Sequence, residues 1–417
     1  MVIFQVRGAR GGSFLSVARA VDWEGRFDRF LEPFLDAWKF KKRRAWAPVY
    51  VRGLLLPGER KSIEPLAARV APGHDQELRH FVSESAWDAA PIEAVLWEKA
   101  DRLLGGDEAY LVIDDTALPK KGDASVGVAP QYCGALGKKA NCQSLVSVTL
   151  ARGDIPLPLS LRLYLPEAWA SDGARRAKVG VPESVVFEEK WRIALREVRR
   201  VREAGVRFTT VLADAGYGAC RGFRDGLTEM GLLWAVGVMS SQRAYPAHVT
   251  TYMPPKGTAG QGPRKHPLPT EPDANVSAFI DALGTRGFRT VTWRNGTKGP
   301  LRAKFAACRV KLPDPSRRTG HKALPSDEVW LVAEQRSANE RKYYVTNHPE
   351  GTSLRTLAAA IKARWSCEQV HQQLKEELGL DHFEGRSWMG LHHHALLTMV
   401  AFAFLQHERV RENKSAA

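Results

Sequence analysis

Residues Tyr110–Thr116 read YLVIDDT, and this stretch decides the fold of the chain. Its strand-favouring apolar residues end in two carboxylates, a pattern typical of a buried strand that delivers acidic groups to a sheet. Neighbouring residues of a strand point to opposite faces, so only one of Asp114 and Asp115 can face a site. These residues alone leave open which of the two it is.

Further strands and helices are predicted after this stretch. The strands are Leu145–Leu150, Leu157–Leu165, Val206–Ala213 and Leu232–Met239, and the helices are Ser184–Ala204 and Cys220–Met230. The Gly- and Lys-rich segment Gly122–Gln143 reads as a loop or hairpin turn. The resulting order, β-β-β-α-β-α-β, is that of an RNase H-like fold. We therefore predict an α/β protein with an RNase H-like mixed sheet flanked by helices.

A second acid follows the fourth predicted strand. Asp214 stands at the carboxyl end of Val206–Ala213. In an RNase H-like sheet the first and fourth strands lie side by side, which would bring Asp115 and Asp214 together. The alternative is that Asp214 caps the helix beginning near Cys220, but the intervening Gly216-Tyr217-Gly218 makes it a poor cap. We interpret Asp214 as part of a site.

The segment Ala358–Lys375, AAAIKARWSCEQVHQQLK, lies within a helix predicted over Leu354–Leu378. Four polar residues recur at helical spacing and are expected along one stripe: Arg364, Glu368, His371 and Lys375. A carboxylate flanked by cations suits a divalent ion held beside a phosphate, provided that other carboxylates arrive from elsewhere. The alternatives are a salt-bridged amphipathic helix and a di-iron Glu-x-x-His site, which would need a second such pair that the sequence lacks.

The predicted core is preceded by a helical region and interrupted by a β-rich one. We predict four segments: a helical DNA-binding domain (1–106), the first part of the RNase H-like core (107–239), a basic β-rich insertion (240–350) and the C-terminal helices of the core (351–417). For the first segment, a helical scaffold packed on the core is an equally good interpretation.

The charge of the chain favours a polyanionic partner. The 417 residues include 61 Lys+Arg and 46 Asp+Glu, a net charge of +15. The excess is concentrated, because residues 1–60 carry 12 basic against 6 acidic residues, and residues 286–322 carry 11 against 1. Nucleic acid is favoured over a membrane surface, and these two regions are expected to contact its backbone.

The cysteines and the apolar segments indicate a soluble protein. The five cysteines are scattered without a C-x-x-C pair, which favours reduced thiols and argues against a disulfide framework or a zinc knuckle. Met1–Phe14 has no apolar run suited to a signal peptide, and Ala395–Leu405 is too short to span a bilayer. The preceding histidines, His392–His394, are expected on a polar helix face.

At these residues the chain resembles the DDE transposases of bacterial insertion sequences, in the RNase H-like group with a β-rich insertion before the final Glu. The family's Tyr-x₂-Arg-x₃-Glu-x₆-Lys signature is matched at Arg364, Glu368 and Lys375, with Ile361 at the Tyr position. The family's first acid precedes a Thr, which selects Asp115. Its Asp-x-x-Tyr-Gly segment is matched by Asp214, Tyr217 and Gly218. Similar stretches also lie at 125–143, 163–169 and 383–394.

This resemblance implies a DNA transposase that cuts at insertion-sequence ends and transfers the 3′-hydroxyl into target DNA. Asp115, Asp214 and Glu368 would be catalytic ligands of two Mg²⁺ (or Mn²⁺) ions, with Arg364 and Lys375 on phosphates. The glycine-flanked lysines are expected either to touch phosphates or to lie in solvated turns: Lys120, Lys121, Lys138 and Lys139.

The same resemblance implies the partners. These are double-stranded DNA, as element ends and as target, and a second copy of the chain in a synaptic homodimer. No membrane is expected, and the implied location is the bacterial cytoplasm, at the nucleoid. Two alternatives remain: an RNase H-like DNA nuclease without strand transfer, and a non-catalytic DNA-binding repressor.

Overall fold

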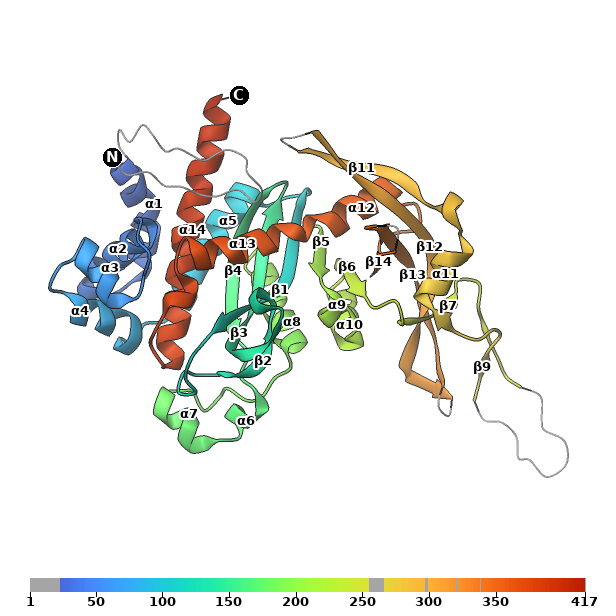
Figure 1. Ribbon diagram of the computed structural model, residues 1–417, viewed down its shortest axis with the longest axis horizontal. Coiled ribbons are helices and arrows are strands. Elements are labelled where there is room, and N and C mark those ends of the chain that lie inside the picture. The colour runs from blue at the N-terminus through green and yellow to red at the C-terminus, as the bar shows by residue number, and fades with distance from the viewer. Residues whose placement is uncertain (1–22, 255–265, 297–298, 320–321, 338, 417) are drawn as a thin grey trace. The chain divides into compact units, whose positions relative to one another are not determined.

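The computed structural model describes residues 23–254, 266–296, 299–319, 322–337 and 339–416 (Figure 1). The chain forms two compact units, and each is described by itself. The first unit is Met1–Thr209 with Trp365–Ala417, and the second is Thr210–Arg364. Both units contain helices and strands, so the predicted α/β class is confirmed. The four domain limits inferred from the sequence stay predictions.

The first unit begins with helices built on aromatic residues at helical spacing. Phe27, Phe30 and Phe34 recur every three or four residues of α1 and are buried, as their periodicity predicts. Phe27 and Phe30 both contact Phe404 of the C-terminal helix, with ring centroids 5.3 and 5.4 Å apart. The N-terminal helices are α1 (Trp23–Ala37), α2 (Lys41–Leu55), α3 (Ile63–Val70), α4 (Asp75–Arg79) and α5 (Ala90–Leu104), with a π-helical turn at His80–Glu84.

Four antiparallel strands form the sheet of the first unit. They are β1 (Ala109–Pro119), β2 (Ala129–Cys133), β3 (Lys138–Arg152) and β4 (Ile155–Leu163). The long strand β3 pairs with β1, with β4 and, through its first residues, with β2. Gly122–Gln143, interpreted from sequence as loop or hairpin turn, therefore contains the β2–β3 hairpin. Leu111, Val112 and Ile113 of β1 are completely buried, as a strand covered on both faces requires.

Two helices cover opposite faces of this sheet: α8 (Lys190–Glu203) and α13 (Trp365–Glu376). Lys190 of α8 contacts Ser144 of β3, whereas Cys367 of α13 contacts Ser147 and Thr149 of the same strand. Even- and odd-numbered residues of a regular strand point to opposite faces, so the two helices lie on opposite sides. Two short helices, α6 (Glu167–Ala170) and α7 (Gly173–Val179), precede α8.

The C-terminal helix α14 (Trp388–Ala416) contacts β4, α2 and α5 of the same unit. By length and composition alone, Trp388–Asn413 could cross a membrane, but 78% of its most apolar window is buried inside the protein. That burial is typical of the core helix of a globular unit.

The second unit is rich in strands. Hydrogen bonding gives the strand order β5-β6-β14-β13-β12-β7-β10, with β11 also paired to β12 and a separate β8–β9 pair. Among the strand pairs of the described residues of this unit, β5 and β6 are parallel, as expected for the two ends of an α/β crossover. The strands are β5 (Thr210–Ala213), β6 (Leu233–Val238), β7 (Arg243–Pro246), β8 (Thr251–Tyr252), β9 (Leu268–Pro269), β10 (Ala274–Asn275), β11 (Arg289–Gly296), β12 (Gly299–Thr319), β13 (Lys322–Gln335) and β14 (Arg341–Thr346).

Four helices accompany these strands: α9 (Ala215–Gly218), α10 (Arg221–Glu229), α11 (Val276–Ala282) and α12 (Leu354–Ala363). The helix predicted over Leu354–Leu378 is therefore wrong as one element, because α12 ends at Ala363 and α13 begins at Trp365. Arg364 between them keeps right-handed helical backbone angles.

Candidate active site

Strand β1 presents its two acids to opposite faces of the first unit's sheet. Asp114 lies opposite Ser147 of β3 and Asp115 lies opposite Val146. Both acids are half-buried. Asp114 therefore shares the face that α13 covers, whereas Asp115 shares the face of α8.

Asp115 is held by a cation of α8. Its Oδ2 lies 2.6 Å from Nζ of Lys190, which also donates to Oγ of Ser144 at 2.8 Å. Lys190 is the first residue of α8, so its side chain reaches forward to the sheet from the start of the helix. Sequence reasoning missed this residue, because nothing distinguishes it from the other basic residues of the KWRIALREVRR segment.

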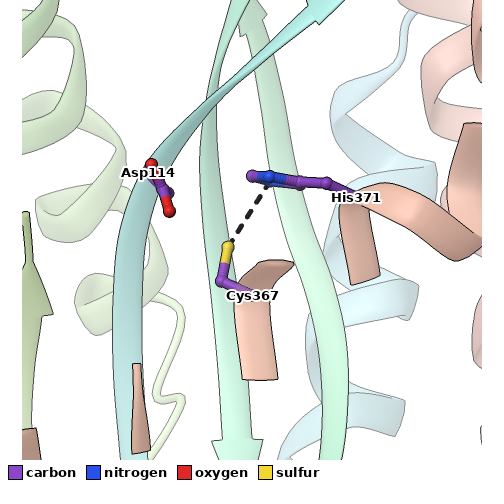
Figure 2. Close-up of side chains that lie close together, drawn as sticks. All are labelled: Asp114, Cys367 and His371. Carbon is purple, nitrogen blue, oxygen red and sulfur yellow. Dashed lines mark hydrogen bonds between the residues drawn. The ribbon is translucent and has the colours of Figure 1, made fainter. Parts of the chain in front are cut away.

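Asp114 lies beside two residues of α13, as Figure 2 shows. One ligand atom each of Asp114, Cys367 and His371 lies within 4.8 Å of the others. The Sγ of Cys367 is 3.4 Å from Nε2 of His371, and the same nitrogen is hydrogen-bonded to Oγ of Ser147 at 2.8 Å. His371 is buried, so its predicted place on a polar stripe with Glu368 is wrong. The helix turns this residue inward against β3.

Glu368 is exposed on α13. Val370 and Leu374 are buried and hold the helix on the sheet. Cys367, which precedes Glu368 in the sequence, is also buried. A rotation of about 100° per residue then carries Glu368 to the edge of the contact, where solvent and ions reach its carboxylate. Lys375 lies one to two turns further along, half-buried, and Arg364 is half-buried at the end of α12 in the second unit.

In the second unit, Asp214 follows β5 directly, as predicted. It does not cap the helix beginning near Cys220, as predicted, since the N-cap residue of α10 is Cys220. Its Oδ1 instead accepts hydrogen bonds from the backbone N–H groups of Gly216 (2.9 Å) and Tyr217 (3.2 Å). The capped helix is the short α9, which sequence reasoning overlooked. The cap uses only Oδ1, and it orients the carboxylate at the end of the strand.

The Tyr-Gly pair after Asp214 has a packing reason. A Cβ atom on Gly218 would lie 1.9 Å from the carbonyl oxygen of Gly237 in β6, so a side chain there would force the backbones apart. Tyr217 is buried and its ring packs 5.5 Å from that of Phe223. Asp214 is thus anchored by backbone contacts of the second unit. The grouping of Asp214 with Asp115 and Glu368 stays a prediction.

The four lysines suggested as phosphate contacts differ in their surroundings. Lys121, Lys138 and Lys139 are exposed. Lys120 is half-buried, and its ammonium donates to the backbone oxygen of Phe383 at 2.6 Å. Burial lowers the pKa of Lys120. Lys120 therefore supports a loop, and only the other three present an ammonium group to solvent.

The three consecutive histidines do not form a polar helix face, and that prediction is wrong. His393 and His394 are buried, and burial lowers the pKa of each histidine of the trio to about 4. Their ring nitrogens bond to backbone and side-chain groups of the core. The partners are Trp388 O and Leu163 N for His392, Val82 O and Trp87 O for His393, and Tyr50 Oη and Gly379 O for His394. They are core residues that join α14 to its neighbours.

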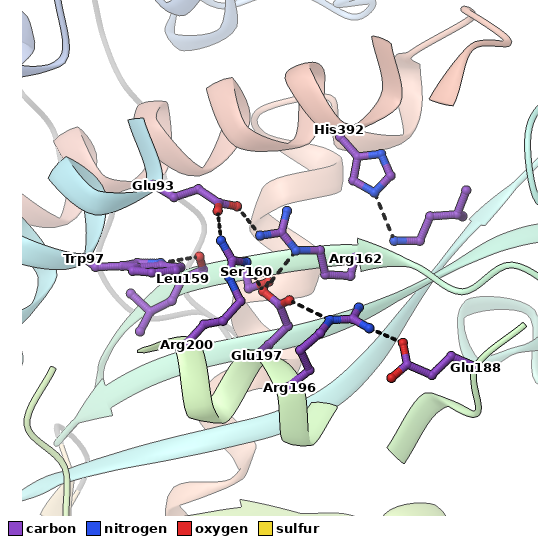
Figure 3. A network of polar contacts seen from close by, with 11 residues as sticks. Glu93, Trp97, Leu159, Ser160, Arg162, Glu188, Arg196, Glu197, Arg200 and His392 are labelled. Atoms are coloured by element: carbon purple, nitrogen blue, oxygen red, sulfur yellow. Dashed lines mark hydrogen bonds and ion pairs between the residues drawn. The ribbon is translucent and has the colours of Figure 1, made fainter. Parts of the chain in front are cut away.

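A network of buried charges supports the α8 face (Figure 3). Glu197 of α8 accepts from Ser160 (2.8 Å) and Arg162 (3.0 Å) of β4, and Arg200 bridges Glu197 and Glu93. Burial alone would raise the pKa of Glu197, but Arg162 and Arg200 together lower it, so the carboxylate stays ionised. The network fixes α5 and α8 on β4 and so holds the helix that carries Lys190.

The three acids predicted as ligands are carboxylates in a strongly basic α/β protein: Asp115 on β1, Asp214 after β5 and Glu368 on α13. Carboxylates of this kind are the donor set of enzymes that act on phosphodiesters with divalent cations. A model of the family described as DDE superfamily endonuclease matches residues 33–300. The chain belongs to this family, whose superfamily generally uses divalent metal ions. Glu368 lies beyond the matched residues.

The individual proteins to which the chain is similar are named as transposases. The chain is 29% identical over 184 residues to the probable transposase for insertion sequence element IS701 of Microchaete diplosiphon, which covers 44% of this chain and 46% of that protein. The chain therefore spans about half the length of this curated relative. Among solved structures, the piggyBac transposase synaptic complex with hairpin DNA gives a TM-score of 0.43 at 10% identity, over 90% of this chain and 68% of that one. The Drosophila P element transposase strand transfer complex gives 0.18 at 13% identity, over 50% and 36%. Neither score is high enough to support an argument about this chain.

Proposed function

We propose that this protein is a DNA transposase that cleaves at the ends of an insertion sequence and joins them to target DNA. The observation that carries the proposal is the accessible carboxylate of Glu368, on a helix that packs against β1 and its two acids, in a chain of the DDE endonuclease family. The strongly basic composition supports DNA as the substrate.

Asp115, Asp214 and Glu368 act in this proposal as the ligands of two Mg²⁺ or Mn²⁺ ions. The donor chemistry fits, because all three groups are hard oxygen ligands. Asp115 is already ion-paired with the Lys190 ammonium. The bound ions would activate the attacking water or 3′-hydroxyl and stabilise the leaving oxygen. Arg364 would bind a phosphate through its planar guanidinium, and Lys375 would do so as a point charge.

Asp114 is a second candidate for the first acid, because its side chain lies on the face that α13 covers. Asp115 is preferred for its place before Thr116, and for the Lys190 contact, which shows that its carboxylate accepts a cation. The partners proposed with this function are double-stranded element ends, target DNA and a second copy of the chain, since two ends must be processed together.

The test is Mg²⁺-dependent cleavage of DNA that carries the flanking ends of the element. Asp214→Asn and Glu368→Gln are expected to lower the cleavage rate on the order of 1,000-fold or more, because each removes a charged metal ligand. Binding of the same DNA, measured by gel shift, should persist. Glu376→Gln is the matched control, since Glu376 is an exposed glutamate on the same helix.

The outcome separates the proposed function from its rivals. Full cleavage by Asp214→Asn or Glu368→Gln would contradict the assignment of the acids. Cleavage without joining of a pre-cut end to target DNA would indicate a nuclease, and DNA binding without any metal-dependent nicking would indicate a repressor.

A further inference from the structure

The cluster of Asp114, Cys367 and His371 has the geometry of a metal site. Cys367 and His371 are four residues apart on α13, so both side chains point to the same side of the helix. Their Sγ and Nε2 atoms are 3.4 Å apart. In a tetrahedral zinc site, with a Zn–S distance of about 2.3 Å and a Zn–N distance of about 2.0 Å, sulfur and nitrogen lie about 3.5 Å apart. The pair therefore already has the spacing that one ion requires.

Strands β1 and β3 bring oxygen ligands to the same point. The carboxylate of Asp114 lies within 4.8 Å of both α13 ligand atoms, and its Oδ1 is oriented by the backbone N–H of Asp115 at 2.8 Å. Ser147, directly opposite Asp114 on β3, places its Oγ 2.8 Å from Nε2 of His371. A thiolate, an imidazole and a carboxylate are three ligands of a tetrahedral zinc site, and a water beside the Ser147 hydroxyl would take the fourth position.

The burial of the cluster excludes a second interpretation. A Cys-His-Asp arrangement is also found in nucleophilic catalysis, but the side chain of Cys367 is completely buried and no substrate could reach its sulfur. Burial is compatible with a structural ion, which stays in place once bound. Sulfur and nitrogen ligands favour Zn²⁺ over Mg²⁺, which takes oxygen ligands.

We propose that Asp114, Cys367 and His371 bind a soft divalent ion of the Zn²⁺ class, separate from the Mg²⁺ ligands of the proposed active site. The ion ties β1 to α13. Because Asp115 and Glu368 are the sequence neighbours of Asp114 and Cys367, it also fixes the backbone of two proposed catalytic acids. The site does not depend on the proposed function, since it is defined by the buried face of the first unit.

Cobalt tests the site directly, because a Co²⁺ ion bound to a thiolate has a charge-transfer band in the near ultraviolet. Full-length protein, freed of metal with a chelator, is titrated with Co²⁺ and then with Zn²⁺. We expect a band that saturates at one equivalent, disappears as Zn²⁺ is added, and is unaffected by excess Mg²⁺. No thiolate-to-cobalt band in the wild-type protein would overturn the proposal, whatever the DNA-cleavage assays show.

Single substitutions locate the ion. Cys367→Ser, His371→Gln and Asp114→Asn should each lose or strongly weaken the band, and Cys367→Ser should also lose the rise in Tm that Zn²⁺ gives the wild-type protein. Cys142→Ser is the matched control, because Cys142 is a buried cysteine of β3 that contacts Gln131 instead of this cluster. A band that survives Cys367→Ser, or that Cys142→Ser removes, would place the ion elsewhere and overturn the proposal.

The same titration distinguishes this site from the proposed active site. Asp115→Asn and Glu368→Gln should keep the cobalt band while losing Mg²⁺-dependent cleavage. If either removed the band, the two sites would be one, and the separate soft-ion site would be excluded. If both kept the band and also kept cleavage, the assignment of Asp115 and Glu368 as catalytic acids would fail and the soft-ion site would stand.

Discussion

The two faces of the first unit's sheet bury different kinds of polar group. On the α8 face the groups are charged and already paired: Asp115 with Lys190, and Glu93 and Glu197 with Arg162 and Arg200. On the α13 face the polar groups are a thiol, an imidazole and a hydroxyl, and Cys367, His371 and Ser147 contact one another. One strand, β1, supplies an acid to each. The difference shows how adjacent residues of one strand can enter unlike chemical environments.

The largest expected effect comes from neutralising the two acids of β1 one at a time. Asp115→Asn should reduce Mg²⁺-dependent DNA cleavage on the order of 1,000-fold or more, because it removes a proposed metal ligand. Asp114→Asn should instead remove the cobalt band. Cleavage lost in Asp114→Asn but retained in Asp115→Asn would reverse the roles of the two faces, and would make Asp114 the first acid.

Acid should lower the stability of the fold through the three consecutive histidines of α14. The histidines of α14 have a folded pKa of about 4, below the usual value of 6.5, so the unfolded chain binds more protons between these pH values. Stability is therefore fully present above about pH 6.5 and falls as the pH drops toward 4, by about 3 kcal/mol for each histidine. Urea unfolding measured by circular dichroism from pH 7 to pH 4 checks this.

A neutral substitute gives the control for this pH dependence. His393→Gln keeps a polar side chain that does not titrate, so its loss of stability between pH 7 and pH 4 should be smaller than that of the wild-type protein. An identical slope in both proteins would show that His393 does not carry the effect. Glu197 behaves differently, because its lowered pKa preserves its contribution until the pH falls below the ordinary glutamate value.

The charged network of the α8 face should be costly to break. Arg162→Met leaves Glu93 and Glu197 with one fewer cation in a buried setting, and the expected loss is about 3–5 kcal/mol of unfolding free energy. Urea denaturation at pH 7 measures it. Arg102→Met is a suitable control, because Arg102 pairs with Glu98 on an exposed face of α5 and should cost at most about 0.5 kcal/mol. Equal costs for the two variants would contradict the role assigned to the network.

The smallest predicted effect concerns the cation that Asp115 already holds. Lys190→Met removes a partly exposed ion pair, which is worth about 1 kcal/mol or less. If Asp115 binds Mg²⁺, removing the competing ammonium should tighten Mg²⁺ binding about fivefold by calorimetry. Weaker binding in Lys190→Met would show that the lysine assists the ion instead of competing with it.

The sequence predicted the parts of the fold that depend on local pattern. The apolar run of Tyr110–Thr116, the alternating leucines of β4 and the parallel β5–β6 pair all carry a period or composition that a single strand reveals. The positions of Asp115, Asp214 and Glu368 on strand, strand end and helix followed from the same patterns.

Features that depend on packing were not predicted. The cap of Asp214, the inward turn of His371, the Lys190 contact and the burial of His392–His394 each require knowing which element lies opposite. Histidines and lysines are especially ambiguous, because the same residue can be solvated or neutralised by neighbours that lie far away in the sequence.

The contact between Gly218 and Gly237 has an evolutionary consequence. The main chains there are too close for even a methyl group, so no single-nucleotide change of either glycine codon gives a residue that fits. Natural substitutions in this part of the second unit are expected to spare both glycines. The backbone that carries the Asp214 carboxylate is fixed with them. A laboratory selection that randomises the segment after Asp214 should recover glycine at position 218 more strongly than it recovers any residue at the other positions.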